Sequence, residues 1–288
     1  MADHRGRLPD GDSWVGPPRE IDLDDPATRA TLDEAVAAFL EAEVRVALTG
    51  AGISVESGIP DFRSPGGLWT VFSPDEYATI DVFMSNPEKA WRLFRAIGRT
   101  LQGAHPNAAH TALARLELAG LLDGVVTQNV DRLHQAAGSR QVLEVHGHHD
   151  NLHCLECDAT TPLDVCCYEE GQPVPRCPSC GGPLKPTVVL FGEAIRDAER
   201  IEELLLRCRA LLVIGTSAQV YPANEFPAVV KMRGGVVIEF NLEPTALTRD
   251  ELAFHGTGSV TDYFVRGAAS VTLAAFAGRV IERAVRGR

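Results

Sequence analysis

Apolar residues recur along this chain in two patterns, one typical of amphipathic helices and the other of short buried strands. In the helix predicted over residues 28–42, one face carries Leu32, Val36, Phe39 and Leu40. Strand patterns cover residues 44–49, 124–127, 141–145, 188–191, 210–214 and 235–241. Further helical patterns cover residues 108–119, 197–207 and 268–286. Strands that alternate with helices predict an α/β fold, with a parallel sheet and helices on both of its faces.

Two segments interrupt this alternation. The first combines glycine, proline and aromatic residues with a helical pattern at 87–102, and the second contains cysteines and little periodicity. Both begin just after predicted strands, where α/β folds place their ligand crevices. We therefore predict a small domain, built from both segments, over a larger one. The expected parts are a flexible N-terminal arm (1–25), the large domain (26–61, 106–149 and 188–288) and the two insertions (62–105 and 150–187).

Composition narrows the class of protein. With 45% hydrophobic and 23% charged residues among 288, the chain matches an ordinary soluble globular protein. Its net charge of −12 argues against a broad nucleic-acid surface and fits basic peptide partners better, although solubility alone would also explain it. Neither a secretory signal nor a bilayer-spanning apolar stretch is apparent. We expect a cytoplasmic protein that binds no membrane and no nucleic acid. The sequence gives no prediction of its oligomeric state.

Four of the seven cysteines form two Cys-x-x-Cys pairs, Cys154 with Cys157 and Cys177 with Cys180. Each pair can direct two thiolates at one ion, and four thiolates complete a closed tetrahedral zinc site. Such a site leaves no position for a substrate, so we predict one structural zinc ion. Cys166 and Cys167 lie next to each other between the two pairs. They are either spare thiols or alternative zinc ligands.

A glycine-rich turn follows the first predicted strand, at Gly50, Ala51 and Gly52. Glycines at such a turn allow backbone amides to approach a phosphate, but the third glycine of a full dinucleotide fingerprint is absent, and a plain tight turn is the alternative. Polar residues also follow two later strands: Gly215, Thr216, Ser217, Asn241 and Glu243. Three polar strand ends on one sheet edge favour a dinucleotide site.

A second polar group lies at Gln128, Asn129 and Asp131, upstream of a histidine framed by Val145 and Gly147. The polar cluster can hold a ligand, and the imidazole of His146 can move a proton near neutral pH. The alternative is a histidine that only satisfies a local hydrogen bond. For His134, a structural role is the better interpretation.

These stretches, taken in order, resemble the sirtuin family of NAD-dependent protein deacylases. The resemblance spans roughly residues 44–270. Its motifs are Gly50-Ala51-Gly52-Ile53-Ser54, Ser57-Gly58-Ile59-Pro60-Asp61-Phe62-Arg63, Thr127-Gln128-Asn129-Val130-Asp131, Val145-His146-Gly147, the two cysteine pairs, Phe191-Gly192-Glu193, Gly215-Thr216-Ser217 and Asn241-Leu242-Glu243. Each motif is short, but as an ordered set they are highly specific.

The resemblance implies that NAD binds between a Rossmann-like domain and a small zinc-bearing domain. His146 would be the catalytic base, and Asn129 would also take part in catalysis. The acyl group of a lysine side chain would pass to ADP-ribose, giving nicotinamide and O-acyl-ADP-ribose. The residues implied to contact NAD are Gly50, Ala51, Gly52, Phe62, Arg63, Gln128, Asn129, Asp131, Gly215, Thr216, Ser217, Asn241, Glu243 and Ala268.

The resemblance also implies a peptide or protein substrate that carries an acyl-lysine and lies as a strand between the two domains. The residues implied to contact it are Phe191, Gly192, Glu193, Val220, Phe94 and Ile97. The last two stand where relatives that remove succinyl or malonyl groups have Tyr and Arg. Because burying a carboxylate without a partner is costly, we expect acetyl or another neutral acyl group, unless Arg95 or Arg99 replaces that Arg.

Alternative functions use the same motifs. Transfer of ADP-ribose to protein, or hydrolysis of NAD, would share the cleft and differ only in products. A non-catalytic NAD-binding or interaction module would be expected to have lost His146 or the Gln128, Asn129 and Asp131 cluster, and both are present. A dehydrogenase would lack a reason for the four cysteines.

Overall fold

The computed structural model describes residues 23, 25–63, 67–249 and 258–287. Nearly all of the expected arm (1–25) lies outside the described residues. The main sheet has six parallel strands in the order β3-β2-β1-β7-β8-β9. The strands are β1 (Arg45–Thr49), β2 (Gly124–Thr127), β3 (Val142–Glu144), β7 (Ala210–Ile214), β8 (Val236–Asn241) and β9 (Tyr263–Arg266). This order reverses direction between β1 and β7, which is the switch point of a doubly wound fold.

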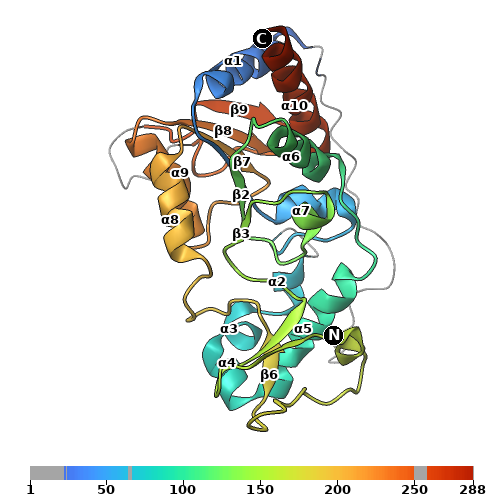
Figure 1. The fold of residues 1–288 in the computed structure, drawn as a ribbon. Coiled ribbons are helices and arrows are strands. Elements are labelled where there is room, and N and C mark those ends of the chain that lie inside the picture. Colours follow the sequence, from blue (N-terminus) through green and yellow to red (C-terminus); the bar gives the residue numbers. More distant parts are fainter. Residues whose placement is uncertain (1–22, 24, 64–66, 250–257, 288) are drawn as a thin grey trace.

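Helices cover both faces of this sheet, as the sequence predicts (Figure 1). Alternate residues of each strand point to opposite faces, so Ala47 packs in one core while Val46 and Leu48 pack in the other. The helices of the first face are α1 (Pro26–Glu41), α6 (Ala108–Leu118) and α10 (Ala269–Arg286); those of the second are α8 (Ala198–Arg207) and α9 (Phe226–Met232). The predicted α/β fold class is confirmed.

The two interrupting segments fold against each other at the other end of the molecule (Figure 1). The cysteine-bearing segment forms a small antiparallel sheet in the order β5-β4-β6. Trp91 and Phe94 of the first segment share a core with Leu152 and Leu184 of the second. The elements are α2 (Leu68–Val71), α3 (Pro74–Tyr77), α4 (Ile80–Ser85), α5 (Pro87–Leu101), β4 (Asn151–Cys154), β5 (Thr160–Pro162), η2 (Val165–Tyr168) and β6 (Leu184–Pro186).

One expected strand is wrong. Residues 188–191 do not join the main sheet; only Phe191 makes an isolated bridge, to Thr79. The side chains of Val188 and Leu190 pack instead in the core of the small domain. A short apolar run marks burial, and periodicity alone cannot tell a buried strand from a buried loop. The sixth strand is β9, whose apolar run is only three residues long, and of these Val265 alone is buried.

Two short elements follow the first two strands of the main sheet. The glycine turn after β1 continues as a 3₁₀ helix, η1 (Ala51–Ser57), and β2 is followed by the single helical turn α7 (Leu133–Ala136). Among the described residues, no helix combines the length and the apolar character needed to cross a bilayer.

Candidate functional site

The turns after β1 and β7 meet at the switch point. The amide of Gly50 donates to Ile214 O at 3.0 Å, and the amide of Gly52 donates to Gly215 O at 2.8 Å. A Cβ on Gly52 would lie 2.8 Å from Gly215 Cα, and one on Gly215, whose φ is +57°, would lie 2.4 Å from Ile53 N. Side chains would therefore push the two turns apart, so the glycines first serve this close approach.

A buried polar network fixes the end of β2 to the glycine turn. The side-chain amide of Asn129 donates to Gly50 O and to Ser54 Oγ, both at 3.1 Å. The Ser54 hydroxyl donates to Asp131 Oδ2 at 2.7 Å, while Asp131 Oδ1 accepts from the Leu133 amide at 2.9 Å. The carboxylate of Asp131 is thereby held beside the turn. Ser54 belongs to the 50–54 motif, but its position between Asn129 and Asp131 is visible only in the structure.

Two histidines lie beneath this network. The rings of His110 and His134 are 4.9 Å apart, and His110 Nε2 lies 3.4 Å from Ser54 Oγ. His134 Nε2 lies 2.9 Å from Thr49 Oγ1. Burial lowers the pKa of His110 to about 4 and that of His134 to about 3, so both rings are neutral at physiological pH. The structural interpretation of His134 agrees with these contacts, and His110 was not anticipated.

His146 follows the end of β3 and faces the same edge of the sheet. Its Nδ1 lies 3.0 Å from Gln128 O, and because a carbonyl oxygen only accepts, Nδ1 of the neutral ring carries the proton. Nε2 then has the lone pair of a base. The side-chain amide of Gln128 donates to Thr216 Oγ1 at 3.0 Å, which connects the ends of β2 and β7. Gly147, with φ of +71°, lies so close to Thr187 O that a Cβ would meet it at 2.0 Å.

Burial lowers the pKa of His146, and the hydrogen bond to Gln128 O opposes this shift. A base must be unprotonated, so the acid limb of kcat/KM against pH is expected to have its midpoint below 6.5, the ordinary histidine value. Activity is retained above this midpoint and lost as the pH falls through it. A pH–rate profile between pH 4.5 and 8 measures it; a midpoint above 6.5 would contradict the assignment of His146 as the base.

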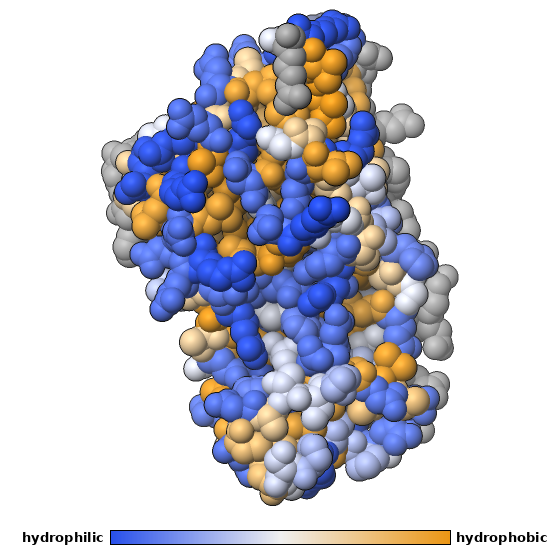
Figure 2. Space-filling view, in the orientation of Figure 1, coloured by the Kyte–Doolittle hydropathy of each residue, from blue (hydrophilic) through white to orange (hydrophobic). Residues whose placement is uncertain are grey.

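The remaining residues expected to meet NAD lie along the same sheet edge. Asn241 Nδ2 donates to Thr216 O at 2.8 Å, so the end of β8 is tied to the end of β7. Glu243 forms an ion pair with Arg266, Ser217 is exposed, and Ala268 caps the N-terminus of α10. In the orientation of Figure 2, hydrophilic residues cover the middle of the molecule, where the two domains meet.

The loop that follows η1 is anchored on α2. The Phe62 ring lies against Trp69 with centroids 4.9 Å apart, and the Trp69 amide donates to Phe62 O at 2.9 Å. Arg63 is exposed, and its amide donates to Asp61 Oδ1 at 3.0 Å. The structure therefore places Phe62 against the small domain rather than among the polar cluster.

The residues expected to meet the acyl peptide differ in their surroundings. Phe191 is 44% exposed, whereas Phe94 and Ile97 are 1% and 8% exposed and pack in the small-domain core. Arg95 is paired with Glu88, and Arg99 Nη1 donates to Tyr168 O at 3.2 Å. Arg95 is thus held within the small domain, whereas Arg99 is exposed and stays the alternative carboxylate-binding residue. Gly192 is exposed, Glu193 and Val220 are half-buried, and the Glu193 carboxylate pairs with the buried Lys185.

The four predicted metal ligands converge. The Sγ atoms of Cys154, Cys157, Cys177 and Cys180 all lie within 4.8 Å of one another, and Cys154–Cys180 and Cys157–Cys177 are each separated by 3.5 Å. Four thiols at these separations suit a tetrahedral zinc ion. Cys166 and Cys167 lie in η2 and are not part of this group, so of the two ligand sets considered, the structure supports the outer four. Cys208 is buried, as a small apolar residue would be.

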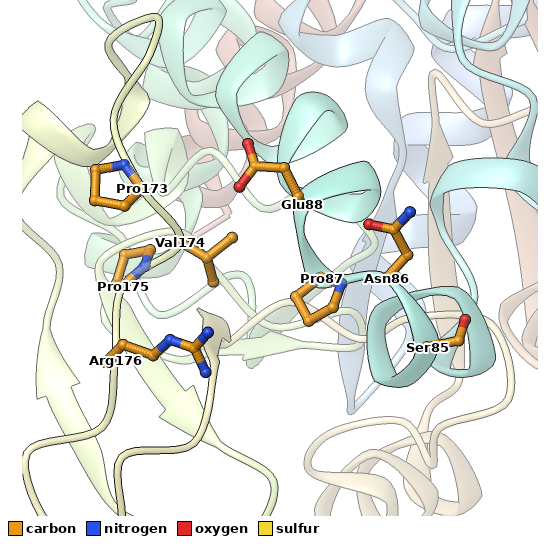
Figure 3. A pocket seen from close by; sticks show the side chains of 8 residues that line it. All are labelled: Ser85, Asn86, Pro87, Glu88, Pro173, Val174, Pro175 and Arg176. Atoms are coloured by element: carbon orange, nitrogen blue, oxygen red, sulfur yellow. The ribbon is translucent and has the colours of Figure 1, made fainter.

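A separate hollow of about 580 Å³ opens in the small domain, between the start of α5 and the loop before Cys177 (Figure 3). Its lining is Ser85, Asn86, Pro87, Glu88, Pro173, Val174, Pro175 and Arg176. None of these residues belongs to the polar network or to the cysteine cluster. The candidate site is therefore the sheet edge and not this hollow.

A doubly wound sheet with a polar network at its switch point and a four-cysteine domain beside it defines a dinucleotide-binding α/β protein. The model of the Sir2 family matches residues 50–222 of the chain. An NAD-dependent protein deacetylase from Caldivirga maquilingensis is 48% identical over 202 residues, which are 69% of this chain and 78% of the relative. An NAD-dependent protein deacylase from Pyrococcus furiosus is 40% identical over 247 residues, 84% and 95% of the two chains.

Solved structures agree. A Sir2 homologue in complex with NAD superposes with a TM-score of 0.78 at 37% identity, over 87% of this chain and 94% of that one. Sir2Af2 bound to a myristoylated histone peptide superposes with a TM-score of 0.71 at 32% identity, over 90% and 100%. The chain belongs to the Sir2 family, and the resemblance to sirtuins is confirmed.

Proposed function

We propose that this protein is an NAD-dependent protein deacylase that removes acetyl or other neutral acyl groups from lysine side chains. The observation that carries the proposal is the convergence of His146, the Gln128, Asn129 and Asp131 cluster and the glycine turn at one edge of the sheet, in a chain of the Sir2 family. Relatives of the chain are named NAD-dependent protein deacetylases and deacylases, which supports the same activity.

The residues present fit NAD. The turns after β1 and β7 meet closely at glycines, and the polar ends of β2, β7 and β8 offer hydroxyl and amide groups beside them. We propose that the turns at 50–52 and 215–217 hold the phosphates, that Asn241, Glu243 and Ala268 lie near the adenosine, and that Phe62 and Arg63 close over the nicotinamide ribose. When bound, NAD supplies the ADP-ribose that accepts the acyl group, with nicotinamide as the leaving group.

The protein's own groups have separate tasks. Both side-chain amide hydrogens of Asn129 are used within the fold, so only its carbonyl oxygen is available to a ligand. Gln128 O orients the His146 ring and fixes its tautomer. Nε2 of His146 can then take a proton from a hydroxyl, and burial keeps the ring neutral for that task. The Ser54 hydroxyl and the Leu133 amide hold the Asp131 carboxylate in place.

The cysteine cluster fits a structural zinc ion. Its four thiols leave no coordination position for a substrate, and they connect β4 to the loop before β6. We propose that the ion stabilises the small domain. We also propose that this domain consists of the two insertions, residues 62–105 and 150–187. The large domain would then comprise residues 26–61, 106–149 and 188–288.

The substrate is proposed to be an acyl-lysine peptide or protein that lies along residues 191–193 and Val220. The complex of Sir2Af2 with a myristoylated histone peptide supports a peptide substrate. We further propose a cytoplasmic protein that binds neither nucleic acid nor membrane, in agreement with its net charge of −12.

The acyl group is expected to be neutral. At the positions where desuccinylating relatives have Tyr and Arg, this chain has the buried apolar side chains of Phe94 and Ile97. A succinyl carboxylate there would lose its hydration without gaining a partner. We expect kcat/KM for an acetyl-lysine peptide to exceed that for the matched succinyl peptide by about tenfold or more. Faster turnover of the succinyl peptide would overturn this specificity.

Mass spectrometry of an acetyl-lysine peptide, incubated with and without NAD, tests the proposed function. Loss of acetyl that requires NAD, with an equal amount of O-acetyl-ADP-ribose, is the expected result. NAD consumption with an unchanged peptide mass would instead indicate NAD hydrolysis. A peptide or protein heavier by one ADP-ribose would indicate ADP-ribosyl transfer. Unchanged peptide and unchanged NAD would contradict an enzyme and favour a binding module.

A further inference from the structure

A buried lysine of the small domain is not explained by NAD or zinc binding. Lys185, in the middle of β6, is only 1% exposed. Its Nζ lies 3.0 Å from Glu193 Oε2, and it donates to Val188 O at 2.6 Å and to Pro186 O at 3.4 Å. Burial lowers the pKa of Lys185, and Glu193 opposes that shift. All three ammonium hydrogens have an acceptor, which is the condition under which a buried charge is tolerated.

The partner carboxylate belongs to a turn at residues 188–193. Glu193 Oε2 also accepts from the Leu190 amide at 2.7 Å, and the Glu193 amide donates to Leu190 O at 3.0 Å. Gly192 between them has φ of +94°, a conformation that glycine adopts without strain. One carboxylate oxygen thus closes the turn and ties it to β6.

The same turn is held on two other sides by backbone hydrogen bonds. The Val189 amide donates to His146 O at 2.8 Å. The Phe191 amide donates to Ala78 O at 2.9 Å, and the Ile80 amide donates to Phe191 O at 3.0 Å. The turn therefore lies between the proposed base, the helical insertion and the cysteine-bearing sheet. The ion pair adds to the packing of Val188 and Leu190 in connecting the turn to the last of these.

We propose that the Lys185–Glu193 ion pair positions the 188–193 turn for the acyl-lysine peptide. This inference rests on the proposed function and deepens it. Glu193 was expected to contact the substrate itself, but its side chain is 19% exposed and its carboxylate is paired with Lys185. Phe191 and Gly192, which reach the surface beside it, are left to meet the peptide backbone. Lys185 and Glu193 are positioning residues, and they make the shape of the peptide site depend on the cysteine-bearing sheet.

The test compares the zinc-loaded full chain with three variants. Lys185→Met alone leaves a buried carboxylate without its partner and can unfold the domain, so the decisive variant is the double change Lys185→Met with Glu193→Gln, which removes both charges. Lys185→Arg retains the charge. Glu88→Gln is the matched control, because it removes another small-domain ion pair, with Arg95, that does not touch the turn.

The first measurement is the Kd of a fluorescent acetyl-lysine peptide by anisotropy, with KM and kcat determined in parallel. The double variant is expected to raise Kd and KM about tenfold, while kcat, NAD affinity and zinc content stay within about twofold of wild type. Lys185→Arg should recover most of the peptide affinity, and Glu88→Gln should leave it unchanged. Hydrogen–deuterium exchange is expected to be faster across residues 188–193 in the double variant only.

Two outcomes overturn the inference. Unchanged peptide affinity and unchanged exchange in the double variant would show that the pair does not position the turn. Parallel losses of peptide affinity, NAD affinity and zinc would show that the pair supports the whole fold. Failure of the proposed function is a distinct result, since wild-type protein would then leave the peptide acetylated with NAD present. Exchange across residues 188–193 would still report whether the pair holds the turn.

Discussion

Replacing His146 with alanine is expected to lower kcat for deacylation on the order of a hundredfold or more, because the proposed proton transfer loses its base. The ring donates one hydrogen bond, to Gln128 O, and burial keeps it neutral. The change removes this one hydrogen bond but keeps the bond from the Val189 amide to His146 O, so the fold and NAD affinity should be retained. Steady-state kinetics with an acetyl-lysine peptide, together with NAD binding by calorimetry, measure the effect.

His148→Ala is the matched control for this prediction. His148 is two residues away and half-buried, and its Nδ1 accepts from the Asp150 amide at 3.2 Å. Its ring hydrogen-bonds with Asp150 and Thr187 and not with Gln128 O, so kcat should change little. Normal turnover in His146→Ala would show that another group is the base. A loss of NAD affinity equal to the loss of kcat would indicate a binding role instead.

Replacing Cys154 with serine is expected to abolish stoichiometric zinc binding and to lower the midpoint of thermal unfolding by roughly 5 °C or more. Cys154 is fully buried, and its Sγ belongs to the four-thiol group. A hydroxyl is a poor replacement for a thiolate ligand, and the loop that carries Cys177 and Cys180 lies outside the strands of the small sheet. Metal analysis by mass spectrometry and differential scanning calorimetry provide the two measurements.

Two control variants separate metal binding from core packing. Cys166→Ser changes an exposed cysteine outside the group, and it should alter neither zinc content nor stability. Cys208→Ser buries a hydroxyl in the core of the large domain, so it should lower stability while leaving the zinc content near one ion per chain. Full zinc retention by Cys154→Ser would contradict the four-cysteine assignment and return Cys166 and Cys167 as ligands.

The candidate site was recognisable from the sequence to the extent that its residues lie in short contiguous motifs. The glycine turn, the Gln128, Asn129 and Asp131 cluster and His146 are each marked by their neighbours, and the structure brings them together. His110 was not recognisable, because it lies inside the helical pattern of α6 and reaches Ser54 only across the fold. The inward turn of Glu193 was likewise hidden, since Lys185 gives no local sign that it is buried.

The sequence by itself determined most of the helices and strands around the main sheet, the α/β class, the two cysteine pairs and, through ordered motifs, the family. Periodicity, spacing and short motifs all depend on residues near one another in the chain. Only the tertiary structure decided that β1 pairs with β7, so that Gly52 contacts Gly215. It also decided that Val188 and Leu190 pack in the small-domain core and not in the main sheet. Such contacts join distant segments through packing, and distant packing leaves no periodic pattern in the local sequence.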